Sequence, residues 1–128
     1  MRASGRPYTV ARPGWFDYNA PDEQLPIFLQ GDLRRSGGPS DGAISRRQIA
    51  QVLVASLASD AANRKTFELV AEEGEAPSDL EPLFAALDPD EPHSIDAARD
   101  EDNMPLSGEP VRVRNDLEAV TAARRETS

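Results

Sequence analysis

Three short stretches of the chain predict β-strands: the first is rich in β-prone residues, and the other two alternate between the two faces of a strand. The first covers residues 8–12 and is expected to end before Pro13, because proline cannot donate to a strand ladder. The second covers residues 25–29, and Pro26 restricts it to the edge of a sheet. The third covers residues 65–70 and carries its aromatic and one aliphatic side chain on the same face.

Apolar side chains at helical spacing follow in two other stretches. Residues 46–59 repeat apolar positions every three to four residues, which predicts an amphipathic helix. Ser45 and Gln48 stand before it at the spacing of a capping box, in which the two side chains satisfy free N–H groups at a helix start. Ser78 and Glu81 have the same spacing, so a second, shorter helix is expected behind them.

The composition changes towards the C-terminus. Residues 88–110 contain eight acidic residues, one basic residue and few bulky apolar groups. Such a segment buries too little surface to offset the conformational entropy lost on ordering. We therefore expect a folded part over residues 1–90 and an acidic, largely disordered tail over 91–128. Within the tail, a short helix is expected over 115–126, capped by Asn115.

Charge and composition exclude several classes of function. The net charge of -9 argues against affinity for nucleic acid or for an anionic membrane, since both require a basic surface. The chain has no cysteine, which excludes disulfides, thiolate chemistry and cysteine-bound zinc. No apolar run reaches the ~20 residues that a membrane helix needs, and no secretory signal opens the sequence. We expect a soluble, cytoplasmic protein.

The search for catalytic or metal-binding residues is mostly negative. The eight glycines fit neither a dinucleotide fingerprint nor a P-loop. The single histidine, His93, lies in the acidic tail and is expected to have no catalytic or metal-binding role. Residues 100–102 are three consecutive carboxylates without the spacing of a calcium loop, so a solvated charge run is expected. The arginine pairs 34–35 and 46–47 are phosphate-binding candidates, with ordinary surface charge as the alternative.

The loop after the first strand is the best ligand-binding candidate. In open α/β sheets, ligands bind at the carboxyl ends of the strands, so this loop would lie at the rim of a pocket. Gly14 gives its backbone the required freedom, and two aromatic residues follow. The alternative is a plain turn with two core aromatics. The candidate binding residues are Arg12, Pro13, Gly14, Trp15 and Phe16.

Three segments, residues 8–15, 44–50 and 66–70, carry a resemblance in this order. Together they resemble the C-terminal part of atypical short-chain dehydrogenase/reductases, the NmrA-like NAD(P)-binding group. In that family a strand ending in Arg-Pro-Gly is followed by an inserted hairpin, a helix introduced by Ile-Ser-Arg and a strand reading Phe-Glu-Leu. The resemblance covers residues 4–88.

The resemblance implies an α/β fold that forms the last strands and helices of a Rossmann-like doubly wound sheet, without the N-terminal nucleotide-binding half. It implies that residues 13–16 contact the nicotinamide end of NAD or NADP through the backbone, while the insertion covers the substrate. The family's Tyr-x-x-x-Lys pair is absent, because Ala61 stands four residues before Lys65, the only lysine. Gln48 stands where the family commonly has aspartate.

Two functions are therefore expected. The first is the C-terminal fragment of an NAD(P)-binding oxidoreductase that is not catalytically competent alone and has no catalytic or metal-binding residue of its own. Its dinucleotide and small-molecule substrate would bind only together with the missing half. The alternative is a non-enzymatic interaction module that pairs exposed strand edges with a partner chain or with itself. A small stand-alone enzyme of another class is the least favoured hypothesis.

Overall fold

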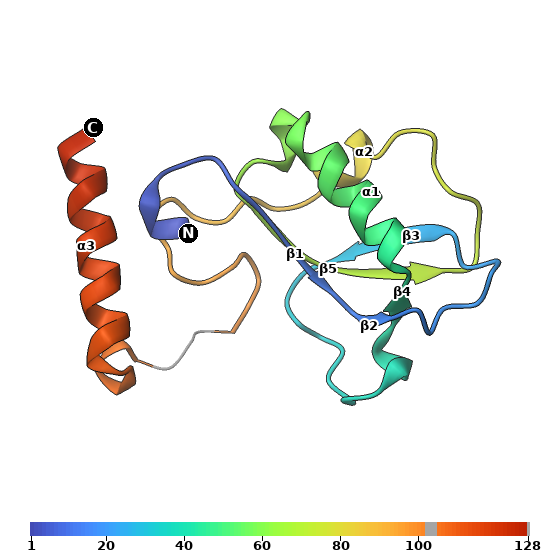
Figure 1. Ribbon diagram of the computed structural model, residues 1–128, viewed down its shortest axis with the longest axis horizontal. Coiled ribbons are helices and arrows are strands. Elements are labelled where there is room, and N and C mark those ends of the chain that lie inside the picture. The colour runs from blue at the N-terminus through green and yellow to red at the C-terminus, as the bar shows by residue number, and fades with distance from the viewer. Residues whose placement is uncertain (102–104, 128) are drawn as a thin grey trace.

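The computed structural model describes residues 1–101 and 105–127. It has a mixed α/β fold in which a curled sheet carries α1 and α2, while α3 lies beside the N-terminal segment at one end (Figure 1). The strands are β1 (Thr9–Pro13), β2 (Trp15–Phe16), β3 (Leu25–Leu29), β4 (Ala43–Ile44) and β5 (Lys65–Glu72). The α-helices of the described part are α1 (Arg46–Leu57), α2 (Glu81–Ala85) and α3 (Val111–Thr127), and 3-10 turns cover η1 (Arg2–Ser4), η2 (Pro39–Asp41), η3 (Asp60–Ala62) and η4 (Leu106–Gly108).

Strand β5 is the centre of the sheet. It pairs in parallel with β1 along one side and antiparallel with β3 along the other. Ala43 in β4 pairs antiparallel with Ala71, and β2 pairs in parallel with β4. The three predicted strands are confirmed, and β3 is an edge strand, as Pro26 required. The α/β class is thus confirmed in the form of a mixed sheet.

Two details of the sheet differ from the expectation. The extended chain does not stop before Pro13 but continues after Gly14 as β2, where it leaves β5 and joins β4. The Gly14 N–H donates to the Leu69 carbonyl at 2.9 Å, and the Trp15 N–H donates to the Gly42 carbonyl at 3.1 Å. The expected inserted hairpin is also absent, because β3 and β4 each pair with β5 rather than with one another. Two-residue strands are too short to show an alternation in sequence.

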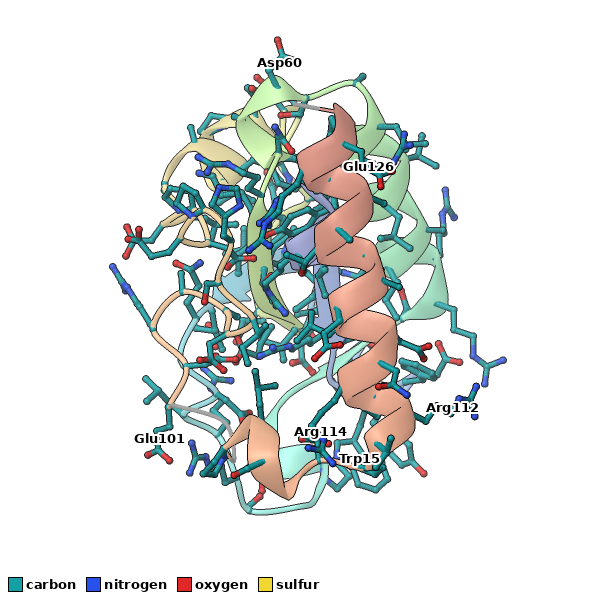
Figure 2. The ribbon with its side chains drawn as sticks, turned by 90° about the vertical axis from the view of Figure 1, so that its left-hand side faces the viewer. Trp15, Asp60, Glu101, Arg112, Arg114 and Glu126 are labelled. Carbon is teal, nitrogen blue, oxygen red and sulfur yellow. The ribbon has the colours of Figure 1, made fainter. Side chains whose placement is uncertain are left out.

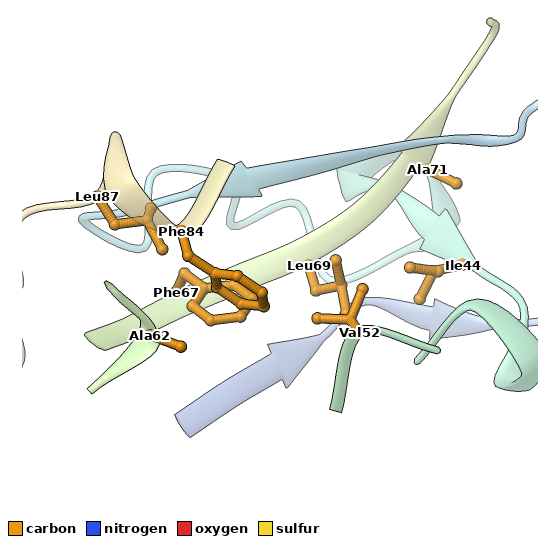
Figure 3. Packing of buried hydrophobic residues seen from close by; sticks show 8 residues of the cluster. All are labelled: Ile44, Val52, Ala62, Phe67, Leu69, Ala71, Phe84 and Leu87. Carbon is orange, nitrogen blue, oxygen red and sulfur yellow. The ribbon is translucent and has the colours of Figure 1, made fainter. Parts of the chain in front are cut away.

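The hydrophobic core lies between β5 and the two helices α1 and α2. Phe67 and Leu69 are fully buried there, as their shared face predicted, and Figure 3 shows Phe67 against Phe84 of α2. Phe28 of β3 stacks on the Phe67 ring with 4.4 Å between centroids. Val52 brings α1 onto the same cluster. The core therefore occupies one face of the sheet.

The first helix begins as predicted and the second does not. In α1 the Ser45 hydroxyl accepts the Gln48 N–H at 3.2 Å, and the Gln48 side-chain oxygen accepts the Ser45 N–H at 3.0 Å, which confirms the capping box. The predicted box at Ser78 is wrong, because α2 starts at Glu81 and its N-cap residue is Leu80, whose side chain makes no capping hydrogen bond. The Asp79 carboxylate instead accepts the Glu81 N–H at 3.0 Å.

In the residues that the structure describes, the acidic segment after α2 has a defined path, so the expected disorder is not shown there. Its anchor is Asp90, which is 1 % exposed. The Asp90 carboxylate accepts the Arg2 Nε–H at 2.9 Å, the Tyr8 hydroxyl at 2.7 Å, the Thr66 hydroxyl at 2.7 Å and the Ala98 N–H at 2.9 Å. Composition gave no sign of this burial, because polar contacts rather than apolar side chains hold the segment in place.

Helix α3 begins at Val111 and not at Asn115, so the predicted start and cap are wrong. It packs on η1, where the Arg124 guanidinium donates to the Ala3 carbonyl at 3.0 Å. Figure 2 shows it from the side, with Arg112 near its start and Glu126 near its end. Among the described residues, no helix has both the length and the apolar character that crossing a membrane requires.

Candidate functional site

A pocket of about 670 Å³ opens at the carboxyl end of β1, beside the middle of β5. Phe67 and Leu69 of β5 turn into the core, whereas the alternating Glu68 and Val70 line the pocket, so the pocket lies on the opposite face of the sheet. All five candidate binding residues contribute to its wall. The lining consists of Arg12, Pro13, Gly14, Trp15, Phe16, Leu29, Asp32, Leu33, Arg34, Asp41, Glu68 and Val70.

Two glycines allow the strands around the pocket to approach one another. A Cβ atom on Gly14 would lie 2.5 Å from the Gly42 carbonyl oxygen, and one on Gly42 would overlap the Val70 side chain. Gly42 also has φ +123°, a conformation that side chains disfavour. Because the obstacle at Gly14 is backbone, a rotamer change cannot relieve it. The chain crossing from β1 to β2 therefore requires glycine at this position.

Gly14→Ala is expected to destabilise the fold by about 2 kcal/mol, since the methyl group would push β2 away from β4. The measurement is the free energy of unfolding from urea titrations. Gly38→Ala is the matched control, because an added Cβ there meets no atom within 4 Å and the residue has no positive φ. Equal stabilities of the two variants would contradict the steric account.

Aromatic side chains form the outer rim of the pocket. Trp15 is 43 % exposed and Phe16 is 46 % exposed, so neither is a core residue. The Tyr18 ring meets the Trp15 ring edge to face, with 5.9 Å between centroids. The Arg46 guanidinium lies 6.0 Å from the centre of the Phe16 ring and forms an ion pair with Asp17 at 3.2 Å. Both rings of the rim are thus partly exposed, and each also has a neighbouring side chain against it.

The two arginines of the lining already have acidic partners. The Arg12 guanidinium contacts the Asp100 carboxylate at 2.7 Å, and the Arg34 guanidinium contacts the Glu72 carboxylate at 3.1 Å. Neither of these two carboxylates belongs to the lining itself. The tail segment around Asp100 therefore takes part in setting the charge at the pocket.

Glu68 differs from the other charged groups of the pocket. It forms no ion pair with any described residue, and its carboxylate accepts the Asp32 N–H at 2.6 Å. Burial raises its pKa above the ordinary value, although backbone hydrogen bonds and the Arg12 charge act in the opposite direction. The strand alternation on β5 was the available sequence signal, because it sets Glu68 opposite the core residue Phe67.

The other chemical candidates have structural or surface roles. His93 is exposed in a turn, with φ +69°. Lys65 is buried, and its ammonium donates to the carbonyls of Phe84 at 3.1 Å and Leu87 at 2.5 Å, so it is not available for catalysis. Arg35 lies 3.8 Å from Asp32 on the surface.

The carboxylate run 100–102 extends beyond the described residues, since Asp102 lies outside them. Within the described ranges, no group of three or more acidic, histidine or cysteine side chains is placed to hold a metal ion.

The backbone of the candidate loop is only partly available to a ligand. The N–H groups of Gly14, Trp15 and Asp17 all donate to carbonyls of the sheet. Pro13 has no N–H. Contacts from this loop to a ligand must therefore come mainly from the Trp15 and Phe16 side chains, and not from a row of free backbone N–H groups.

Comparison of the sequence with protein-family models finds no matching family, and comparison with curated proteins finds no matching protein.

Proposed function

We propose that this chain forms the C-terminal part of an NAD(P)-binding oxidoreductase of the short-chain dehydrogenase/reductase type, the part that contacts the nicotinamide ring. We also propose that the chain is not catalytically competent alone. One observation carries the proposal: Arg12 to Phe16 all line a single pocket at the carboxyl end of β1, beside the parallel strand β5. In α/β sheets that end of the strands is where nucleotide cofactors bind.

The composition of the pocket suits the nicotinamide ring and not the phosphates. The ring would lie against Trp15 and Phe16, with Leu29 and Val70 as further apolar wall. A pyrophosphate needs free backbone amides or unpaired cations, and here the loop amides are bonded within the sheet and both lining arginines are paired. The phosphate-binding groups would therefore come from another segment or chain.

The outer edge of β1 is a suitable place for such a segment to join. The Tyr8 carbonyl accepts the Arg64 N–H at 2.8 Å, so the alternation along β1 turns the backbone groups of Thr9 and Ala11 away from β5. In the part of the chain that the structure describes, no strand pairs with this edge. A further parallel strand here would extend the sheet in the Rossmann-like, doubly wound sense.

Helix α1 also has an uncovered apolar side next to this edge. Leu53, Val54 and Leu57 are 43 %, 68 % and 88 % exposed, and with Thr9 they line a hollow of about 500 Å³. A strand added to β1 would lie about 4.8 Å away, which brings its following helix to within about 10 Å of α1. That separation suits helix packing, so both features support one added strand-helix unit.

The same open edge supports the alternative function, an interaction module that pairs strand edges with a partner chain or with itself. The two functions differ in what they require of the pocket, because only the oxidoreductase part has to bind a nicotinamide ring there. A chain that remains monomeric at high concentration, with well-dispersed NMR signals, would count against the alternative.

The test is to titrate the chain with nicotinamide, AMP, NADH and NADPH while following amide and Trp15 indole signals by NMR. Nicotinamide is expected to shift residues 12–16 saturably, with Kd of about 1–10 mM, because only a small ring is buried. AMP should leave these signals unchanged, and neither dinucleotide should bind more than about tenfold tighter than nicotinamide. Micromolar dinucleotide binding, or no response to nicotinamide, would overturn the proposal.

Two leucines provide a matched pair of variants for this test. Leu33 lines the pocket and is 85 % exposed, whereas Leu57 is 88 % exposed and lies outside it. Leu33→Ala should weaken nicotinamide binding about twofold to threefold, and Leu57→Ala should leave it unchanged. Equal effects of the two substitutions would show that the ring binds elsewhere.

A further inference from the structure

The charges that line the pocket are unbalanced. Three carboxylates, those of Asp32, Asp41 and Glu68, face two guanidinium groups whose charge is already compensated by Asp100 and Glu72. An anionic ligand would have to displace one of these partners and would still meet the lining carboxylates. A cationic ligand would meet neither obstacle.

The three carboxylates are not equally free. The Asp41 carboxylate accepts the Ser36 hydroxyl at 2.5 Å, the Ser36 N–H at 2.8 Å and the Gly37 N–H at 2.8 Å, so it is committed to its own loop. Asp32 is more than half exposed and lies 3.8 Å from Arg35. Glu68 is half-buried, forms no ion pair among the described residues although the Arg12 charge acts on it, and lies next to Val70 in the wall. It is therefore the carboxylate best placed to attract a ligand charge.

The remaining wall suits the body of an organic cation. Trp15 is a partly exposed ring, and aromatic faces attract ammonium groups, while Leu29, Leu33 and Val70 supply apolar surface. The Phe16 ring already has a cation over it, the Arg46 guanidinium at 6.0 Å. A desolvated carboxylate beside aromatic faces binds an ammonium group through both charge and ring quadrupole.

We propose that this pocket binds a small organic cation with an apolar body, such as a protonated arylalkylamine or a quaternary ammonium compound, and that Glu68 is its counter-ion. This ligand would be the substrate beside the nicotinamide ring, so its link to reductase chemistry rests on the proposed function. Its binding to the chain does not, because the site is formed by residues of this chain.

The experiment compares three probes of similar size: benzyltrimethylammonium, benzyl alcohol and phenylacetate. Binding to the intact chain is followed by the fluorescence of Trp15, the only tryptophan, and mapped by NMR. The cation is expected to bind about tenfold tighter than the neutral alcohol, and phenylacetate is expected not to bind. Equal or tighter binding of phenylacetate, or no preference for the cation over the alcohol, would overturn the proposal.

Two variants then locate the charge. Glu68→Gln keeps a side-chain oxygen for the Asp32 N–H and should weaken benzyltrimethylammonium binding about fivefold to tenfold, while benzyl alcohol binding stays unchanged. Glu81→Gln is the control, because it removes the same charge from exposed Glu81 at the start of α2, which packs on the opposite face of the sheet. An unchanged cation affinity in Glu68→Gln would overturn the role of Glu68.

The probe comparison on the unaltered chain decides the ligand class even if Glu68→Gln does not fold. The result is also separate from the nicotinamide test, since neutral nicotinamide can bind without a cation preference. Conversely, the cation preference can hold in a chain that does not respond to nicotinamide.

Discussion

Replacing Asp90 with alanine is expected to destabilise the fold by about 3 kcal/mol. Asp90 is 1 % exposed, and its carboxylate is the shared acceptor for four donors. The substitution leaves all four without this acceptor: the Arg2 guanidinium, the Tyr8 hydroxyl, the Thr66 hydroxyl and the Ala98 N–H. Donors left unsatisfied in a buried place cost more than the hydrogen bonds themselves contribute. The measurement is the free energy of unfolding in urea.

Glu91→Ala is the matched control for this prediction. Glu91 is the next residue and is exposed, so loss of its carboxylate should change the stability by less than about 0.5 kcal/mol. If Asp90→Ala and Glu91→Ala have the same small effect, the network around Asp90 does not hold the acidic segment to the sheet.

The same network makes stability depend on pH with a definite sign. Burial alone would raise the Asp90 pKa, but hydrogen bonds from Ala98, Thr66, Tyr8 and Arg2 outweigh it, and the pKa is lowered. A carboxylate with a lowered folded-state pKa stabilises the fold above its unfolded pKa of about 3.9 and loses that contribution as the pH falls further. The stability difference between the natural chain and Asp90→Asn should therefore shrink below about pH 4.

Phe67→Ala is expected to destabilise the fold by about 3–5 kcal/mol, because it removes a fully buried ring and leaves a cavity. The ring stacks on Phe28 at 4.4 Å and meets Phe84 edge to face at 6.1 Å between centroids. Its loss therefore weakens the contact between β5, β3 and α2 together. Thermal and urea unfolding measure the effect.

Phe16→Ala removes an aromatic side chain of the same size from the exposed rim of the pocket, where it is 46 % exposed. Its effect on stability should stay below about 1 kcal/mol. If Phe16→Ala lowered the free energy of unfolding more than Phe67→Ala, the core would not lie on the Phe67 face of β5.

The elements that the sequence predicted correctly are those specified by short-range chemistry. The Ser45 and Gln48 side chains act within one helical turn, so the start of α1 is visible in four residues. β-prone residues before Pro13 identified β1, alternation over five or more residues identified β3 and β5, and it also separated Phe67 from Glu68. Where a residue's partner is close in sequence, the pattern is sufficient.

The features that the sequence did not predict depend on distant partners. Asp90 is buried by groups from η1, β5 and the loop before β1, which no local pattern links. Ser78 has the spacing of a capping box but does not cap, and the Asp79 carboxylate accepts the Glu81 N–H instead. For the pocket, residues 12–16 were predicted from the sequence, whereas Glu68, Leu29 and Leu33 come from segments that only the sheet brings together.

The central position of β5 affects the order in which the sheet can form during synthesis. Its partners β1, β3 and β4 all precede it in the chain, and among the described strands the only pairing available before β5 emerges is the short contact between β2 and β4. The backbone groups of β1 and β3 therefore have no β5 partner until the ribosome has synthesised residue 72. Sheet formation is then a late, non-local event. The nascent chain is most exposed to wrong pairing during this interval.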